Sequence, residues 1–456
     1  MKIKILASML AGALAMLPVT ANAGWGGGGV GAYGEPITIY GWQNHTYEFI
    51  EAGAPGSQRD YSEIRGNAGN IGFLGFVDTG MEGLKVTWRC EQFTYMNDYG
   101  GNQGGWCNRN SKVGISGSMG EIMMATWLLP YNEMVAGWVD PWYDAGNASH
   151  TNIMGSVGAN TIFYNVGDFG GFNYSTAGTG SYNQGFNRRQ EEIIQYMGST
   201  GAVSYRFAYT VGDNDEKANL SHKSGNAAGE VDPIIFSTGV AYSSGPFWGA
   251  ITYQKHEEWA AGTLTSIDAA DIDGDGETDD TVQAMTDSEA ESWRIAGRYI
   301  ADLGGGSTLT LAAMFENVEY DFKDVSANVL KDFGFSTDVF GSVTAGSNVK
   351  FDRDAFMVSA KFAPGGNVDF RLMYAEADDL DITATGLSTD NSAESGADTT
   401  LFGVFYALGD STELSLSYIE VDNDKYGTYG TGIGGTGLGT VNNETEIIAL
   451  GFLTMF

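Results

Sequence analysis

A group of carboxylates between residues 271 and 279 has the spacing of a loop that could hold a calcium ion. Its members are Asp271, Asp273, Asp275 and Asp279. The first three alternate along the chain and Gly276 follows them, which is the order in which a tight turn surrounds Ca²⁺ with oxygen ligands. Val282 stands where a bidentate acid is expected near the end of such a loop. The segment predicts either a calcium site or a solvated acidic loop, and nothing in the sequence calls for another cofactor.

The side chains that commonly carry catalysis are scattered. The four histidines are His45, His150, His222 and His256, and the chain has neither a G-x-S-x-G element nor an H-E-x-x-H motif. Hydrolysis by a nucleophile or by zinc needs such groups at a fixed spacing. We therefore expect a protein that is not an enzyme.

The first 23 residues have the pattern of an export signal. Lys2 and Lys4 precede an apolar run over residues 5–17, and Ala21-Asn22-Ala23 has the form of a signal-peptidase site. The run is shorter than the roughly 20 residues that a membrane-spanning helix requires. We expect residues 1–23 to be a cleaved signal peptide and the chain to leave the cytoplasm.

The expected export from the cytoplasm bears on the state of the two cysteines, Cys90 and Cys107. An oxidising compartment allows an isolated pair to close, whereas a zinc site would need further ligands nearby. We expect a disulfide between them.

Composition and charge narrow the class of protein. The chain has 66 glycines, 12% aromatic residues and 8 prolines, which favours a β-rich architecture with many turns. Its net charge of −34 repels nucleic acid, so no nucleic-acid partner is expected. The acids gather in loop-like segments such as 268–291 and 376–398.

Period-two patterning runs along the chain. Residues 203–211, 368–374 and 414–418 each alternate large apolar side chains with small or polar ones. A strand of a soluble sandwich can show one such repeat. A whole chain of them, with aromatic residues near the strand ends, favours a barrel whose apolar face meets lipid.

Connections between these segments are of two alternating kinds. Short ones such as 78–83 and 118–120 are rich in turn formers, and long ones rich in Gly, Asp, Asn and Ser lie between them. This predicts an all-β transmembrane antiparallel barrel of about 16 strands over residues 37–456, after a Gly-rich segment at 24–36. Among the expected strand starts are Gly69, Ser292 and Asp354. Residues 160–174 also read as a hairpin, which would sit inside the third long loop or raise the number to 18.

Basic side chains alternate with apolar neighbours in several predicted strands, so they should point into the lumen. They are Arg89, Arg189, Arg206, Arg294, Arg298, Lys361 and Arg371. The opposite orientation would cost roughly 2–4 kcal/mol for a charge that faces lipid at mid-depth. Each could contact solutes, or could pair with a lumenal acid such as Glu91 or Asp369 and hold the wall together.

Several motifs resemble the Gram-negative general porin family. Residues 109–120 are similar to R-N-S-x-V-G-L-x-G-x-F-G, residues 129–131 fall where that family has T-P-Y, and residues 39–41 are similar to L-Y-G. The alternating apolar residues that end at Phe456 look like the signal read by the barrel-assembly machinery. The resemblance spans the chain loosely and is tight only at residues 107–131 and in the last strand.

The resemblance implies a homotrimer of 16-stranded barrels, each with its third long loop folded into the pore as a constriction. That loop would cover residues 130–186, and its acids Glu133, Asp140 and Asp144 would face a basic wall. Opposed charges of this kind influence which ions pass. Part of the wall is missing, because Asn70 and Thr126 stand where the family commonly has Arg.

The leading hypothesis is therefore a porin, surrounded by outer-membrane lipid and lipopolysaccharide, that lets small hydrophilic solutes diffuse passively through a water-filled lumen. We expect a mild preference for cations. Two alternatives remain open: a channel specific for one substrate, and a surface adhesin or structural barrel with a plugged lumen.

Overall fold

The computed structural model describes residues 28–30, 36–53, 56, 58–94, 106–143, 148–155, 186–187, 189–210, 234–257, 287–325, 347–384, 394–425, 427, 429–430 and 444–456. The predicted signal peptide, Asp144, the 160–174 segment and the acidic residues 271–279 lie outside these ranges. The structure therefore does not test the conformation that was expected of these residues.

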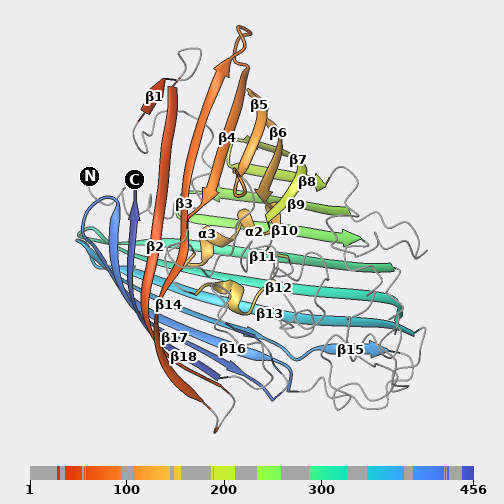
Figure 1. Ribbon diagram of the computed structural model, residues 1–456, viewed down its shortest axis with the longest axis vertical. Coiled ribbons are helices and arrows are strands. Elements are labelled where there is room, and N and C mark those ends of the chain that lie inside the picture. The colour runs from red at the N-terminus through yellow and green to blue at the C-terminus, as the bar shows by residue number, and fades with distance from the viewer. Residues whose placement is uncertain are drawn as a thin grey trace.

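The described residues form a closed ring of sixteen antiparallel strands in chain order (Figure 1). The wall strands are β2 (Pro36–Gly53), β3 (Arg59–Asp78), β4 (Lys85–Phe93), β5 (Ser111–Gly117), β6 (Gly120–Leu128), β7 (Arg189–Thr200), β8 (Val203–Thr210), β9 (Ile234–Ser244), β10 (Phe247–Glu257), β11 (Asp287–Gly304), β12 (Ser307–Val325), β13 (Ser347–Ala363), β14 (Val368–Ala377), β16 (Ala397–Ala407), β17 (Thr412–Asn423) and β18 (Glu444–Met455). Two short strands are additional: β1 (Gly28–Val30) pairs with β2, and β15 (Asp381–Ala384) pairs with β13. The predicted all-β barrel of 16 strands is confirmed.

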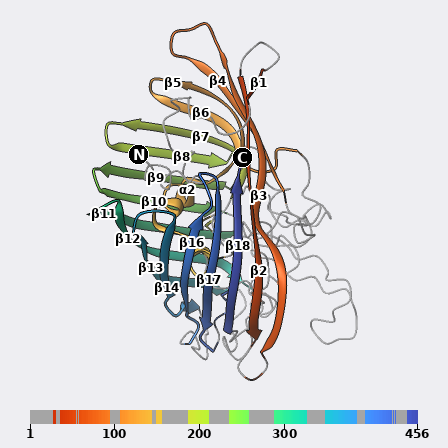
Figure 2. The same ribbon diagram turned by 90° about the vertical axis from the view of Figure 1, so that its left-hand side faces the viewer.

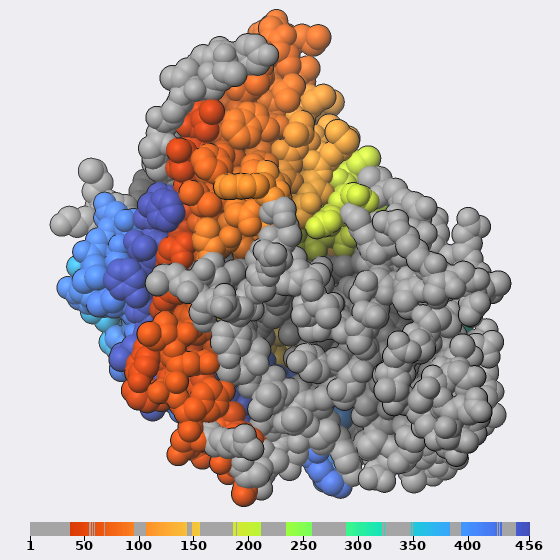
Figure 3. Space-filling model, in the orientation of Figure 1, coloured from red at the N-terminus to blue at the C-terminus, as the bar shows by residue number. Residues whose placement is uncertain are grey.

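The ring closes where the last strand meets the first long one. In the β18–β2 ladder Leu450 lies opposite Tyr47, and the backbones of Gly41 and Phe456 exchange hydrogen bonds of 2.9 and 3.0 Å. Figure 3 shows β2, red, beside β18, dark blue, on the outer surface. The wall thus has no open edge at this seam.

The third long connection adds no strand to the wall between its neighbours. β6 pairs directly with β7, for example Ile122 with Tyr196. The 18-stranded alternative therefore has no place between these two strands.

Three strands begin earlier than the sequence predicted. β3, β11 and β13 start at Arg59, Asp287 and Ser347 instead of near Gly69, Ser292 and Asp354. Most of the added residues are polar, yet their backbones still pair with a neighbouring strand, as Asp60 does with Glu51. These strands rise beyond the apolar band, so polarity there does not mark a loop.

The two faces of the wall differ in chemistry. On β18 the alternating Ile448, Leu450 and Phe452 are 50%, 51% and 44% exposed, whereas Ile447 and Ala449 between them are buried. Figure 2 shows the strands from the side. Large apolar side chains on the outside and small or polar ones inside are the pattern of a barrel wall in lipid. No helix among the described residues combines the length and apolar character needed to cross a membrane.

The connections fall into the two predicted kinds. Gly245 and Pro246 alone join β9 to β10, and Gly245 has a φ of 58° that a two-residue hairpin turn favours. At the other rim, residues 211–233 separate β8 from β9. Short turns and long connections therefore alternate around the ring.

Candidate functional site: the barrel lumen

The third long connection enters the lumen through two short helices, α2 (Pro130–Glu133) and α3 (Ala136–Val139), followed by the 3-10 turn η3 (His150–Asn152). Pro130 stands in the first turn of α2, where its missing N–H costs nothing. The described part of this connection is almost entirely buried: Tyr131, Met134 and Val135 are each 0% exposed. The predicted inward fold of the loop is confirmed.

The wall makes room for these helices with small side chains. Met134, Val135 and Val139 belong to the same apolar cluster as Ala241, Ala250 and Ala296 of the wall. Gly239 of β9 allows this close approach, because a Cβ there would lie 2.7 Å from Met134 Sδ and would force that side chain to shift. Polar bonds add to the packing: Ser237 Oγ accepts the Tyr131 N–H at 3.0 Å, and Thr252 Oγ1 donates to Tyr131 O at 3.1 Å. α2 is therefore fixed to β9 and β10.

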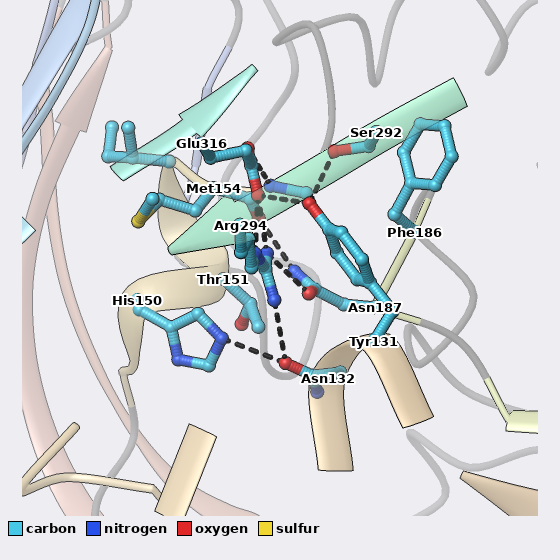
Figure 4. Close-up of polar contacts among 12 residues, drawn as sticks. Tyr131, Asn132, His150, Thr151, Met154, Phe186, Asn187, Ser292, Arg294 and Glu316 are labelled. Atoms are coloured by element: carbon cyan, nitrogen blue, oxygen red, sulfur yellow. Dashed lines mark hydrogen bonds and ion pairs between the residues drawn. The ribbon is translucent and has the colours of Figure 1, made fainter. Parts of the chain in front are cut away.

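Glu316 of β12 is the centre of a buried charge cluster (Figure 4). Arg294 Nε donates to its Oε2 at 2.6 Å, and Arg353 Nη2 donates to its Oε1 at 2.7 Å. Tyr131 Oη and the Gly155 N–H also donate to this carboxylate, at 2.8 and 2.7 Å. Burial raises the pKa of the Tyr131 hydroxyl well above its ordinary value, so it keeps its proton and remains a donor. Both ends of the described loop segment are thereby joined to the wall.

The cluster continues into the loop through Asn132 and Asn187. Arg294 donates to the side-chain oxygens of both, at 3.0 and 2.7 Å. His150 lies beside Asn132, with 3.0 Å between His150 Nε2 and Asn132 Oδ1. The other ring nitrogen, His150 Nδ1, contacts Asp140 Oδ2 at 2.8 Å. Asp140 thus meets a histidine of its own loop and not the basic wall that was expected to face it.

Glu133 does face the wall. It pairs with Arg206 of β8 and accepts a hydrogen bond from Trp127 Nε1 at 2.9 Å. All three side chains are buried. Of the two loop acids that the structure describes, only Glu133 makes the expected contact with a basic residue of the barrel.

Two further clusters on the wall pair the predicted bases with acids. Glu91 pairs with Arg89 and with Arg109, and it accepts a hydrogen bond from Tyr40 Oη at 2.5 Å. On the opposite part of the ring, Arg371 pairs with Asp369 and Glu413 at 2.7 Å each, and Lys361 lies 3.2 Å from Asp369. Arg371 also donates to Pro141 O of the loop at 3.0 Å. At these positions the bases pair with Glu91 and Asp369 and hold neighbouring strands of the wall together, as the second of the two predicted alternatives has it.

The remaining two predicted bases are placed differently. Arg189 Nε donates to Asn110 Oδ1 at 2.7 Å. Arg298 of β11 lies over the indole of Trp138, 4.4 Å from the ring centroid, and its Nε is a buried donor without an acceptor among the described residues. Six of the seven predicted bases therefore have a polar partner, and Arg298 has an aromatic one.

The missing basic positions are partly compensated. Asn70 is buried and its Oδ1 accepts the Trp42 N–H at 3.2 Å. The guanidinium of Arg109 lies 4.6 Å from the ring centroid of Trp42, so a cation still stands next to this position. Thr126 is half-buried and pairs with Ser111 across the β5–β6 hairpin.

The predicted disulfide is confirmed. Cys90 of β4 is bonded to Cys107, and their Cα atoms are 4.7 Å apart. The bond joins β4 to the segment that leads into β5, next to Glu91 and Arg109. It therefore holds the loop-side end of this strand pair together.

Sequence reasoning missed Glu316 and Arg353, the acid and one of the bases at the centre of the loop contact. Glu316 lies in a predicted strand and Arg353 directly before one, and both have inward parity, Glu316 after Met314 and Arg353 before Ala355. The same alternation that selected Arg294 would have selected them. The expected strand start at Asp354 placed Arg353 in a loop, and the lumenal acids that were predicted were Glu91 and Asp369. Tyr131, His150 and Asn187 gave no such signal, because their roles depend on how the loop folds.

Comparisons with known proteins give one consistent result. A model of the Gram-negative porin family matches residues 10–426. Major outer membrane protein P.IB of Neisseria gonorrhoeae is 27% identical over 228 residues, which are 47% of this chain and 61% of that protein. Major outer membrane protein P.IA of Neisseria meningitidis serogroup C is 26% identical, over 57% of this chain and 59% of that protein. The chain thus spans about three fifths of the length of these relatives.

Solved structures extend the likeness to nearly the whole barrel. The anion-selective porin from Comamonas acidovorans has a TM-score of 0.61 at 17% identity, with 92% of this chain and 100% of that chain covered. Vibrio cholerae OmpT in its trimer form has a TM-score of 0.53 at 11% identity, with 92% and 99% covered. At these identities the likeness is one of fold.

Proposed function

Because the chain belongs to the Gram-negative porin family, we propose that it forms a water-filled channel for the passive diffusion of small hydrophilic solutes and ions across the bacterial outer membrane. The observation that carries this proposal is the two-faced wall. Its outer surface is apolar, and its inner surface carries the charged clusters of Glu91, Glu133, Glu316 and Asp369. A channel needs fixed charges in a low-dielectric wall and no cofactor.

The mechanism requires no bond-making step, and both the family and the fold favour a channel over an enzyme. Each solute meets a free-energy barrier set by the width of the lumen and by its fixed charges. The third loop narrows the lumen in a fixed position, because buried apolar contacts and the Glu316 cluster hold it against the wall. We expect its position to change little during transport.

Selectivity follows from the balance of lumenal charges. Most bases of the described wall are neutralised by adjacent acids, so the net charge of −34 decides the bulk preference. We propose a mild preference for cations, limited by screening beyond about 10 Å at 0.1 M salt. Reversal potentials in a salt gradient measure it, and an anion-selective value would contradict it.

The family and the apolar outer face of the barrel also indicate its partners. We propose a homotrimer, for which membership of the family and the likeness to a barrel described in a trimer form are the support. The apolar outer face would contact lipid and lipopolysaccharide. The alternating apolar face of β18 that ends at Phe456 would be recognised by the barrel-assembly machinery.

Single-channel recording of the refolded, full-length protein in a planar bilayer tests the function. Stable ohmic currents that scale with salt concentration are expected. Conductance that a single solute blocks at low concentration would favour a substrate-specific channel. The absence of any current from correctly folded protein would favour a structural barrel or adhesin with a plugged lumen and would overturn the proposal.

A further inference from the structure

Arg298 is set apart from the other lumenal bases by what surrounds it. It faces inward from β11, where it lies opposite Trp248 of β10 on one side and Ala312 of β12 on the other. No ion pair or hydrogen bond joins it to another residue in the described ranges, and its Nε is buried without an acceptor. The two Nη groups are not among the buried atoms, so a ligand in the lumen can reach them and supply the acceptors that the described residues do not.

Aromatic side chains orient this guanidinium. Trp138 of α3 stacks on Trp248, with ring centroids 5.2 Å apart and an angle of 5° between the planes. Arg298 lies over the same Trp138 ring at 4.4 Å. Stacking uses the face of a guanidinium and leaves its N–H groups free to bind in the plane. Trp138, supported by Trp248, therefore lies against one face of Arg298 and leaves its Nη groups available.

The chemistry of the ligand follows from the geometry of the fork. Two parallel N–H groups match the two oxygens of a carboxylate, and such charge-assisted pairs are the strong ones. Trp138 is only partly buried and offers apolar surface beside the guanidinium. A carboxylate with a flat apolar body fits this combination better than a bare anion.

The position of the pair lies on the route that a solute would take. Trp248 is the second residue of β10, directly after the short turn at Gly245 and Pro246. Trp138 belongs to the folded-in loop. The site therefore lies between the constriction loop and the rim of short turns.

We propose that Arg298, Trp138 and Trp248 form a lumenal binding site for small aromatic carboxylates. This inference rests on the proposed channel function and names a class of solute that the channel would retain. A bound carboxylate would sit in the ion pathway, so its residence is visible as a block of current.

The experiment compares three probes on single channels of the full chain in potassium chloride. Benzoate carries both charge and ring, formate carries the charge alone, and benzamide carries the ring alone. We expect benzoate to block at the lowest concentration, formate to block weakly and benzamide to leave the current unchanged. A block by benzamide equal to that by benzoate would overturn the proposal.

Variants assign the block to the residues. R298Q should raise the half-blocking benzoate concentration roughly tenfold to a hundredfold, because a charge-assisted hydrogen bond is lost. R298K keeps the charge but not the fork and should give an intermediate value. W138F should weaken the benzoate block more than the formate block. R89Q is the matched control, because it also removes one positive charge from the lumen, while Arg109 still neutralises Glu91. It should leave the benzoate block as in the unmodified protein.

The outcomes separate the two proposals. If the unmodified protein conducts and benzoate blocks R298Q as strongly as the unmodified protein, the site is wrong and the channel stands. If R89Q weakens the block as much as R298Q does, general lumenal charge and not this site binds the carboxylate. If the folded protein passes no current, the channel function itself fails.

Discussion

Arg294 and Arg298 lie four residues apart on the inner face of β11 and differ in almost every contact. Arg294 is 0% exposed and is surrounded by Glu316, Asn132 and Asn187. Arg298 has the face of Trp138 and no acceptor among the described residues. The first arginine holds the described part of the third loop to the wall, and the second is the one that we propose binds a solute. Identical residue types at positions of identical parity therefore have different roles according to whether the loop offers them a hydrogen-bond acceptor.

The largest effect is expected from removal of the acid at the centre of the loop contact. E316Q leaves Arg294 and Arg353 buried without a counter-charge, which should lower the free energy of unfolding by about 3–5 kcal/mol. Urea unfolding of the refolded protein in detergent, followed by tryptophan fluorescence, measures it. E319Q is the control, because Glu319 points outward from the same strand and forms only a half-exposed pair with Lys350 at 2.8 Å, worth about 1 kcal/mol or less. Equal losses in the two variants would contradict the role of Glu316.

The comparison between the two arginines can be made directly. R294Q removes a buried ion pair and should destabilise the protein by about 3 kcal/mol. R298Q breaks no hydrogen bond or ion pair with another described residue, so it should change the free energy of unfolding by less than about 0.5–1 kcal/mol. The same urea titration applies to both. A loss in R298Q as large as in R294Q would mean that Arg298 is structural.

A smaller effect is expected from the loop acid that reaches the wall. In E133Q the hydrogen bond from Trp127 can persist, but Arg206 loses its counter-charge. The cost should be about 1–3 kcal/mol, and the reversal potential in a salt gradient should move toward anions. In E319Q, where the lost charge is outside the lumen, the reversal potential should move less. No difference between these two variants in reversal potential would place Glu133 outside the ion pathway.

The smallest effect concerns the acidic segment for which the sequence predicts either a calcium site or a solvated loop, in contrast to the lumenal acids that pair with a protein base. If Asp271, Asp273, Asp275 and Asp279 bind calcium, isothermal titration should give a binding heat that D273A abolishes, with little change in conductance. E319Q, which also removes one exposed acid, should keep the heat. An unchanged calcium heat in D273A would leave a solvated acidic loop.

Much of the barrel could be predicted because its signals are local. Alternation places Phe207 outside and Arg206 inside without knowledge of any other strand, since the two faces meet lipid and water. The two kinds of connection follow from glycine and proline positions such as Gly245 and Pro246. The strand extensions at Arg59, Asp287 and Ser347 were missed because paired backbone beyond the apolar band needs no apolar side chain.

The site was harder to predict because its contacts are not local. Parity shows that Arg294 points inward, but not that Asn132 and Asn187 accept its hydrogen bonds from 162 and 107 residues away. Asp140 was expected to face the wall, yet its carboxylate contacts His150 of the same loop. Whether a lumenal base is paired depends on how the third loop folds, and the sequence pattern does not predict that fold.

The packing of α2 and α3 also bears on how the pore behaves in time. Met134, Val135, Val139 and Trp142 are buried against the wall, so the loop leaves its place only if a whole apolar contact is broken together with the Glu316 cluster. Such an opening is a local unfolding event and is rare compared with the passage of single ions. The constriction should therefore act as a fixed aperture and not as a gate, and long recordings should show one steady open level with few closures.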